Sequence, residues 1–147
     1  MSLESNVRRM AGTRPFDLLP REAVQLIAFS CERRMAKAGE LLFSAGEPAD
    51  SAYFLLSGEL SLVIDDAERR VEPGALVGET ALLADMVRRV SAKATEDSEL
   101  LRIPGAVFRR VLSEFPRAAA QLRATVAARA RDLVNQLDET RARLFES

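Results

Sequence analysis

The sequence predicts a mainly β domain with flanking helices, in which a β-roll or jelly-roll barrel is closed by C-terminal α-helices. Three observations lead to this prediction. Short apolar runs alternate with glycine-containing turns between residues 33 and 103, and the pattern becomes helical after Pro104. The chain has 147 residues, 48% of them hydrophobic, and a net charge of -1, which is typical of one globular domain with an ordinary core.

The N-terminal stretch up to residue 19 is polar. We expect residues 1–14 to be a lead-in, with a tag remnant as one reading of residues 1–3, and the domain to span residues 15–147. A first helix is predicted from Pro20, because proline is favoured at the first helical position. Its expected apolar side carries Ala23, Leu26, Ile27 and Phe29.

Alternating side chains predict strands between the turn glycines at positions 39, 46, 58, 74 and 78. In "ELSLVIDD" one face carries Leu60, Leu62 and Ile64. In "RVSAKAT" one face carries Val90, Ala92 and Ala94. Arg88 shares the parity of this second face, so we expect Arg88 to point inward and Arg89 to point outward.

Helices follow the strands. "GAVFRRVLSEF" predicts a short helix, and a longer one is expected over residues 116–145. The longer helix carries a modest 4-3 seam, made of Val126, Ala130, Leu133, Leu137, Thr140 and Leu144. A homodimer contact and a helix lying on its own roll explain this seam equally well.

Composition excludes several function classes. The chain has no histidine, one cysteine, and neither a nucleophile nor a phosphate-loop motif, so we expect no enzyme and no metal site. Basic residues are scattered among acids, which argues against nucleic-acid binding. No apolar run is long enough to span a membrane, and a cytoplasmic location is the default expectation.

The stretch "VGETALLADMVRR", residues 77–89, has the components of a sugar-phosphate pocket. A helical turn after Gly78 would aim backbone N–H groups at an anion, and the inward guanidinium of Arg88 suits a phosphate. The carboxylate of Glu79 can accept from a sugar hydroxyl. A simple ion pair between Arg88 and Glu79 explains the same residue types and stays open here.

This stretch resembles the phosphate-binding cassette of the cyclic nucleotide-binding domain family, which includes the bacterial catabolite activators and protein kinase A regulatory subunits. "LFSAGEPADSAYFLLSG" fits a second signature of that family. The resemblance implies a ligand, cAMP rather than cGMP, and no other cofactor. It implies binding by Gly78, Glu79, Thr80, Ala81, Arg88 and Arg89. Glu79 would hold the ribose 2′-hydroxyl, and Arg88 would clamp the phosphate.

The chain departs from the family pattern at Arg89-Val90, where small residues are usual, and Arg89 replaces the threonine of many cGMP-preferring domains. In the bacterial activators a hydroxyl pair covers the base; the corresponding positions here are Leu133 and Val134, which implies an apolar cover. The resemblance thus predicts a regulatory domain that signals through its C-terminal helix, without a DNA-binding domain. The alternatives are a non-binding structural or dimerisation module of the same fold, and a sensor fragment of a larger regulator.

Overall fold

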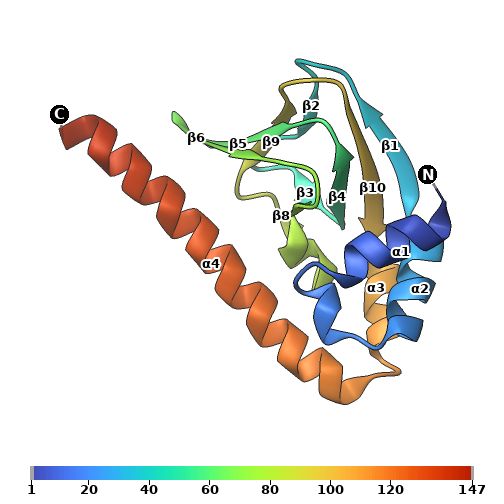
Figure 1. Cartoon of the computed structure of the whole chain (residues 1–147). Helices are drawn as coiled ribbons and strands as arrows, with labels where there is room; N and C mark the ends of the chain where they lie inside the picture. The colour runs from blue at the N-terminus through green and yellow to red at the C-terminus, as the bar shows by residue number, and fades with distance from the viewer. Residues whose placement is uncertain (1, 147) are drawn as a thin grey trace.

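The computed structural model describes residues 2–146, with side chains described over that range except at 126, 130, 134 and 137–146. Antiparallel strands make up the upper part of the molecule in Figure 1, and helices from both ends of the sequence gather below them. This arrangement confirms the predicted fold class, a mainly β roll with flanking helices. In chain order the elements are α1 (Leu3–Ala11), η1 (Phe16–Leu18), α2 (Arg21–Phe29), β1 (Glu32–Ala36), β2 (Leu41–Phe43), β3 (Pro48–Ala49), β4 (Ser51–Ser57), β5 (Leu60–Ile64), β6 (Ala67–Val71), β7 (Leu76–Val77), η2 (Glu79–Leu82), β8 (Met86–Val87), β9 (Ser91–Ala94), β10 (Ser98–Pro104), α3 (Gly105–Leu112) and α4 (Pro116–Glu146).

Two antiparallel sheets form the roll. The first has the strand order β1-β10-β4-β7 and the second β2-β9-β5-β6, while β3 pairs with β8. In the second sheet the partners of Leu60 and Leu62 are Ala94 and Ala92. All four residues are at most 3% exposed, so the predicted inward face is confirmed for them, although Ser61 between the two leucines is buried as well, at 4%.

The buried side chains form two clusters. One lies between the first sheet and the helices, where the rings of Phe16 and Phe108 meet edge to face with centroids 6.1 Å apart. The other lies between the two sheets and includes Phe43 and Tyr53. Leu133 of α4 packs against this second cluster, so the long helix is attached to the interior of the roll as well as to the other helices.

The N-terminal residues differ from the prediction of a polar lead-in. Residues 3–11 form α1, whose N-cap Ser2 accepts a hydrogen bond from the backbone N–H of Ser5. Val7 and Met10 of α1 are buried in the cluster under the helices, and so is Phe16. The apolar stripe of α1 is too narrow to stand out among its arginines, but its 3-4 spacing is that of a helix packed on a core.

Helix α2 begins at Arg21, one residue later than predicted, with Pro20 as its N-cap, and it buries a different side from the predicted one. Its buried residues are Ala23, Val24, Ile27 and Ala28. Leu26 and Phe29, which we placed on the apolar side, are 49% and 77% exposed. Ala23 and Ile27 lie one turn apart, and Leu26 and Phe29 form a second row on the other side of the helix.

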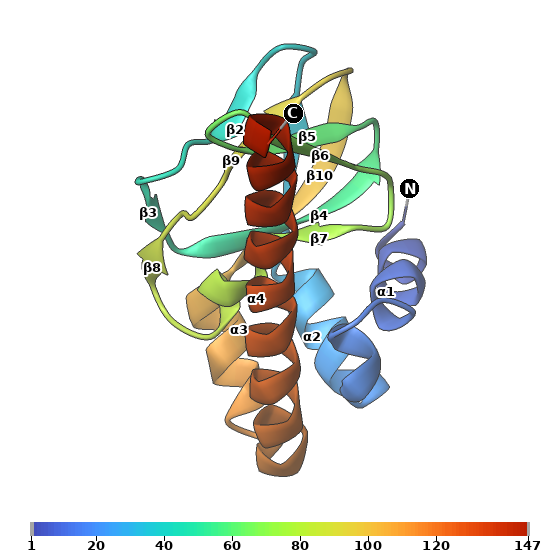
Figure 2. The ribbon, with the colours of Figure 1, turned by 90° about the vertical axis from the view of Figure 1, so that its left-hand side faces the viewer.

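Helix α4 begins at Pro116 and passes η2 and β6. In Figure 2 it crosses in front of the strands, and in Figure 1 its last turns extend beyond them. The predicted seam falls mostly outside the described side chains, because only that of Leu133 among its six residues is described. No described helix combines the length and the apolar character that crossing a membrane requires.

Candidate functional site

A cavity of about 280 Å³ lies between the roll and α4. Its volume is close to the ~300 Å³ at which small-molecule pockets begin. Residues from β2, β3, β5, β6, β7, η2, the segment around β8 and α4 enclose it. They are Phe43, Ala49, Leu62, Arg69, Val71, Ala75, Leu76, Val77, Gly78, Glu79, Thr80, Val87, Arg88, Arg89, Val90, Arg129, Asp132, Leu133 and Gln136.

The turn at Gly78 forms one wall of this cavity. Gly78 has a left-handed backbone with φ of 72°, and the 3-10 turn η2 follows it, as predicted. A Cβ atom at this position would overlap the guanidinium of Arg88, so the absence of a side chain lets Arg88 lie against the backbone. The turn therefore depends on glycine for both its conformation and its space.

Thr80 and Ala81 have different positions in this turn. Thr80 is half-buried and lines the cavity, whereas Ala81 is fully buried and does not. The backbone N–H of Ala81 donates to the carbonyl of Gly78 at 3.1 Å, and its own carbonyl accepts from Nη1 of Arg109 at 3.3 Å. Ala81 thus connects the turn to α3, and among the six predicted binding residues it is the one that does not line the cavity.

Arg88 points inward, as its parity predicts, and is only 8% exposed. The turn at residues 46–47 holds its backbone: the Arg88 N–H donates to Glu47 at 2.8 Å, and its carbonyl accepts from Gly46 at 2.9 Å. The guanidinium stacks on the ring of Phe43, with Cζ 4.1 Å from the centroid, and approaches Tyr53 at 5.9 Å. These contacts fix the side chain beside the cavity.

No carboxylate among the described residues pairs with Arg88, and its Nε is buried without a hydrogen-bond partner. Burial lowers the pKa of the guanidinium, because removing a cation from water disfavours its charged form. A buried cation of this kind is costly unless an anion satisfies it. This is the electrostatic signature expected where an anionic ligand binds.

Glu79 is 9% exposed and lines the same cavity. Its Oε2 lies 3.4 Å from Nη1 of Arg129, in an ion pair that lacks the alignment of a hydrogen bond. Burial raises the pKa of Glu79, and the charges of Arg129 and Arg69 oppose that rise. The mutual Arg88–Glu79 pair that we left open is therefore not formed.

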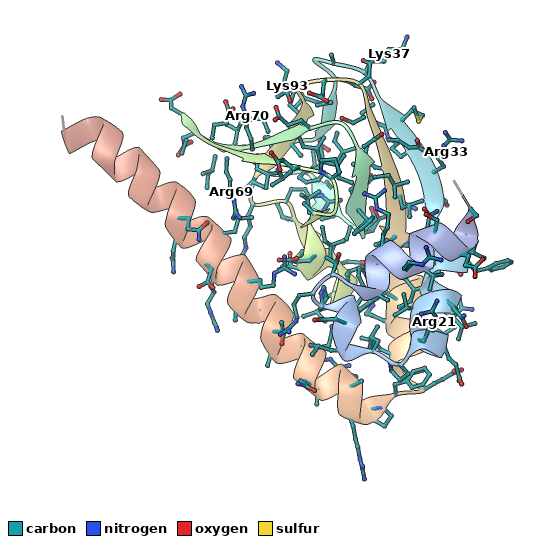
Figure 3. All side chains as sticks on the ribbon, viewed as in Figure 1. Arg21, Arg33, Lys37, Arg69, Arg70 and Lys93 are labelled. Carbon is teal, nitrogen blue, oxygen red and sulfur yellow. The ribbon has the colours of Figure 1, made fainter. Side chains whose placement is uncertain are left out.

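The end of the cavity farther along α4 combines apolar and polar groups. Leu133, a predicted base cover, is half-buried and lines the cavity; the side chain of Val134, the second predicted cover, lies outside the described residues. Asp132 and Gln136 flank Leu133 on α4. Figure 3 shows Arg69 between β6 and α4, where its Nη1 donates to Oε1 of Gln136 at 3.0 Å.

The outward residue Arg89 is exposed, as predicted, yet it contributes to the cavity rim. Sequence reasoning missed four other charged or aromatic residues of the site: Phe43, Arg69, Arg129 and Asp132. Phe43 and Arg69 lie in short strands without a distinctive pattern. For Arg129 a signal existed, because it precedes Leu133 by four residues and therefore lies one helical turn from a predicted cavity residue.

Solved structures resemble this chain over most of its length. A cyclic nucleotide-binding-like protein from Brucella abortus is 35% identical, with a TM-score of 0.65, and the match covers 74% of this chain and 98% of that one. The regulatory domain of Toxoplasma gondii PKA, solved with cAMP, has a TM-score of 0.71 at 24% identity, covering 83% of this chain and 48% of that one. At this identity the second likeness concerns the fold alone.

A curated relative places the same domain in a much longer protein. The lysophospholipase NTE1 of Phaeosphaeria nodorum is 32% identical over 124 residues, which are 80% of this chain but 8% of that protein. Another lysophospholipase, nte1 of Aspergillus terreus, is 29% identical over 125 residues and is likewise covered over 8% of its length. Residues 33–115 match the family model described as the cyclic nucleotide-binding domain. The chain belongs to the cyclic nucleotide-binding domain family.

Proposed function

We propose that this chain binds a 3′,5′-cyclic nucleotide, cAMP in preference to cGMP, and acts as a regulatory domain that signals through α4. The observation that carries the proposal is Arg88, a buried guanidinium beside the cavity with no carboxylate partner among the described residues. A cyclic phosphate carries one negative charge and two free oxygens, and a guanidinium fork matches this geometry.

Glu79 and the turn at Gly78 support a ribose phosphate over an isolated anion. Glu79 directly follows Gly78 and lines the cavity, as Arg88 does. A carboxylate acceptor and the guanidinium proposed to hold the phosphate therefore face the same space. A ribose 2′-hydroxyl can donate to the carboxylate while the phosphate contacts Arg88. An inorganic phosphate would instead place its own negative charge beside the carboxylate of Glu79 and would offer it no sugar hydroxyl.

The proposed preference for cAMP rests on the apolar side chains among the groups at the base end of the cavity. Leu62, Val71 and Val90 lie on the roll side and Leu133 on the α4 side. Guanine has more polar groups to satisfy on its outer edge than adenine, and burying them without partners is costly. The exposed Arg89, in place of a threonine hydroxyl, removes one partner that cGMP would use.

The construction of the cavity supports the proposed signalling through α4. The turn η2 and the roll supply the phosphate end, and α4 supplies Arg129, Asp132, Leu133 and Gln136. A ligand that contacts both sides favours the docked position of α4 by its differential affinity for the two positions. The predicted homodimer seam also lies on α4, so ligand binding would affect that homodimer through the same helix.

One observation favours the alternative, a module of this fold that binds nothing. Arg88 stacks on Phe43 at 4.1 Å, and a cation over an aromatic ring is partly satisfied without any ligand. The stacking leaves the buried Nε unpaired, so it compensates only part of the burial cost.

Calorimetric titration decides between the two. The chain would be titrated with cAMP, cGMP and linear 5′-AMP, which has the same base and sugar but lacks the cyclic phosphate. We expect a dissociation constant for cAMP of about 1 μM or lower, equivalent to about -8 kcal/mol, and weaker binding of the other two. Absence of heat with both cyclic nucleotides would leave the non-binding module as the function.

A further inference from the structure

Helices α1 and α2 carry an exposed apolar face on the side of the molecule away from α4. Six large apolar side chains among the described residues are exposed, and three of them belong to these two helices: Leu3 at 46%, Leu26 at 49% and Phe29 at 77%. In Figure 1 α1 and α2 lie at the right-hand side of the molecule, whereas α4 extends to the left. This face is therefore separate from the nucleotide cavity and from the seam predicted on α4.

A groove of about 270 Å³ runs between the two helices. It is lined by Leu3, Glu4 and Val7 of α1 and by Arg21 and Gln25 of α2. Val7 is only 3% exposed and lies at the base of the groove, and Leu3 precedes it by one helical turn. Phe29 follows Gln25 by one helical turn, so its ring continues the α2 side of the groove. The groove and the exposed apolar side chains thus belong to one surface, the α1–α2 face.

Two charges of opposite sign line this groove without meeting each other. Glu4 and Arg21 are both exposed, and neither forms an ion pair with another described residue. Figure 3 shows Arg21 on the side of α2 that faces away from α4. The other exposed charges of the two helices are Arg8 and Glu22, so two arginines balance two glutamates. A membrane surface or a nucleic acid would require an excess of positive charge, which this face lacks.

A surface that carries both signs beside apolar groups is complementary to itself. In a two-fold dimer every contact occurs twice, because residue i of one copy meets residue j of the other and the reverse. A two-fold axis along the groove would place α1 of one copy on α2 of the other. We propose that the α1–α2 face is a homodimer interface, separate from α4, in which Glu4 of each copy pairs with Arg21 of the other and the exposed apolar side chains are covered.

The size of the face predicts a weak dimer. Each helix has nine residues, so it is about 13 Å long and about 10 Å wide. The pair therefore offers less than the ~800 Å² per partner of a typical stable interface. We expect a dissociation constant above about 1 μM. Sedimentation of the nucleotide-free chain at increasing concentration should show an average mass that rises from 16.2 kDa toward the dimer.

Exchanging the two charges tests the pairing between copies. Arg21→Glu and Glu4→Arg would be sedimented each alone and mixed in equal amounts. Each variant alone places like charges at both symmetric contacts, so its self-association should weaken by about tenfold or more. In the mixture one partner is acidic at both positions and the other is basic, so a heterodimer should form. An effect within one chain cannot produce this recovery, because mixing changes neither chain.

Phe29→Ser tests the apolar part of the face. Because Phe29 is 77% exposed in the single chain, this change should leave the free energy of unfolding nearly unchanged while it weakens the dimer by about fivefold or more. Leu41→Ser is the matched control. Leu41 is 54% exposed on β2 and does not line the groove, so this variant should associate like wild type.

The outcomes do not depend on the proposed function, because no nucleotide is present. A wild-type chain that stays a monomer over the whole concentration range overturns the proposal. A dimer that survives both charge reversals, or a mixture that stays monomeric, overturns it as well; survival would leave the seam on α4 as the interface. Circular dichroism melts check that the variants are folded. If a charge variant is not folded, the comparison of Phe29→Ser with Leu41→Ser decides, and equal association of these two overturns the proposal.

Discussion

Gly78 and Arg88 share one space at the cavity wall. The guanidinium of Arg88 lies where the Cβ atom of any other residue at position 78 would be. The two residues come from different sides of a loop, and one is useful only because the other has no side chain. The position of Arg88 at this wall therefore depends on the absence of a side chain at position 78, and this leads to the first prediction.

Gly78→Ala should weaken cAMP binding by more than its effect on stability explains. Alanine at φ of 72° costs about 1 kcal/mol in backbone strain, and its Cβ also displaces Arg88. Gly39→Ala is the control, because Gly39 has φ of 89° but no atom within 4 Å of an added Cβ. Urea unfolding should show a loss for both variants, and calorimetry should show weaker binding for Gly78→Ala alone. Equal affinities of the two variants would mean that Arg88 does not need this space.

Replacing Arg88 with methionine should separate stability from function. Methionine keeps the aliphatic part of the side chain, loses the stacking on Phe43 and removes a buried charge without a carboxylate partner among the described residues, so we expect the free energy of unfolding to stay equal or rise by about 1 kcal/mol. Affinity for cAMP should fall at least about tenfold, because the charge-assisted contact to phosphate is lost.

Arg89→Met provides the matched comparison for Arg88→Met, since Arg89 is adjacent, exposed and of the opposite parity. Its affinity for cAMP should change by less than about threefold, which is the scale of a screened surface charge. Denaturant unfolding and calorimetry would be run on both variants. Comparable losses of affinity at the two positions would show that the inward assignment does not determine which arginine meets the phosphate.

Stability and affinity should both depend on pH through Glu79. Its pKa in the folded chain is raised above the ordinary value of 4.5, mainly by burial. As pH rises from 4.5 through the folded pKa, the unfolded chain loses its proton first, so the contribution of Glu79 to the free energy of unfolding falls. Below that window, where both states are protonated, there is no penalty. Affinity for cAMP should change in the opposite direction and increase with pH, because an ionised carboxylate accepts the ribose hydroxyl.

Glu79→Gln isolates this contribution, since the amide has a similar shape and does not titrate. The stability gained by this variant over wild type should increase across the window and then remain constant. Urea unfolding at a series of pH values measures it. A difference between the two proteins that is the same at every pH would mean that Glu79 does not titrate in this range.

The cassette could be predicted from the sequence because its geometry is local. The alternation that leads into β9 predicts an inward Arg88, although Arg88 itself lies between β8 and β9, and a glycine before a short turn positions Glu79 at the same cavity. Arg129 could not be assigned in this way, because its contact with Glu79 depends on where a long helix crosses the roll, and periodicity defines a face of a helix but not its crossing point. The same limit applies to Leu26 and Phe29 of α2, whose apolar character predicted burial although they are 49% and 77% exposed.

The N-terminal helix was missed for a different reason. Hydrophobic patterning identifies a helix when the apolar stripe is wide, and α1 buries only Val7 and Met10. Ser2 as N-cap and arginines in the last turn are the signals that its sequence does contain. Such end signals are weak individually, and the packing of the helix against α2 supplies the rest of its stability.

The final prediction separates the base cover from a dimer seam on α4. Leu133 lines the cavity and packs against the cluster inside the roll, so Leu133→Asp should weaken cAMP binding by about 2 kcal/mol or more through the loss of apolar contact and the burial of a charge.

A Leu137→Asp, Leu144→Asp double variant changes only the seam predicted farther along the helix, where each residue adds about 1.5 Å of distance from the ligand. It should convert a dimer held by this seam to a monomer, because like charges would face one another across the seam, and it should leave affinity unchanged. Mass by light scattering and affinity by calorimetry would be read on the same samples. A double variant of unchanged mass would show that the seam holds no dimer, and Leu133→Asp with wild-type affinity would show that α4 does not cover the base at this position.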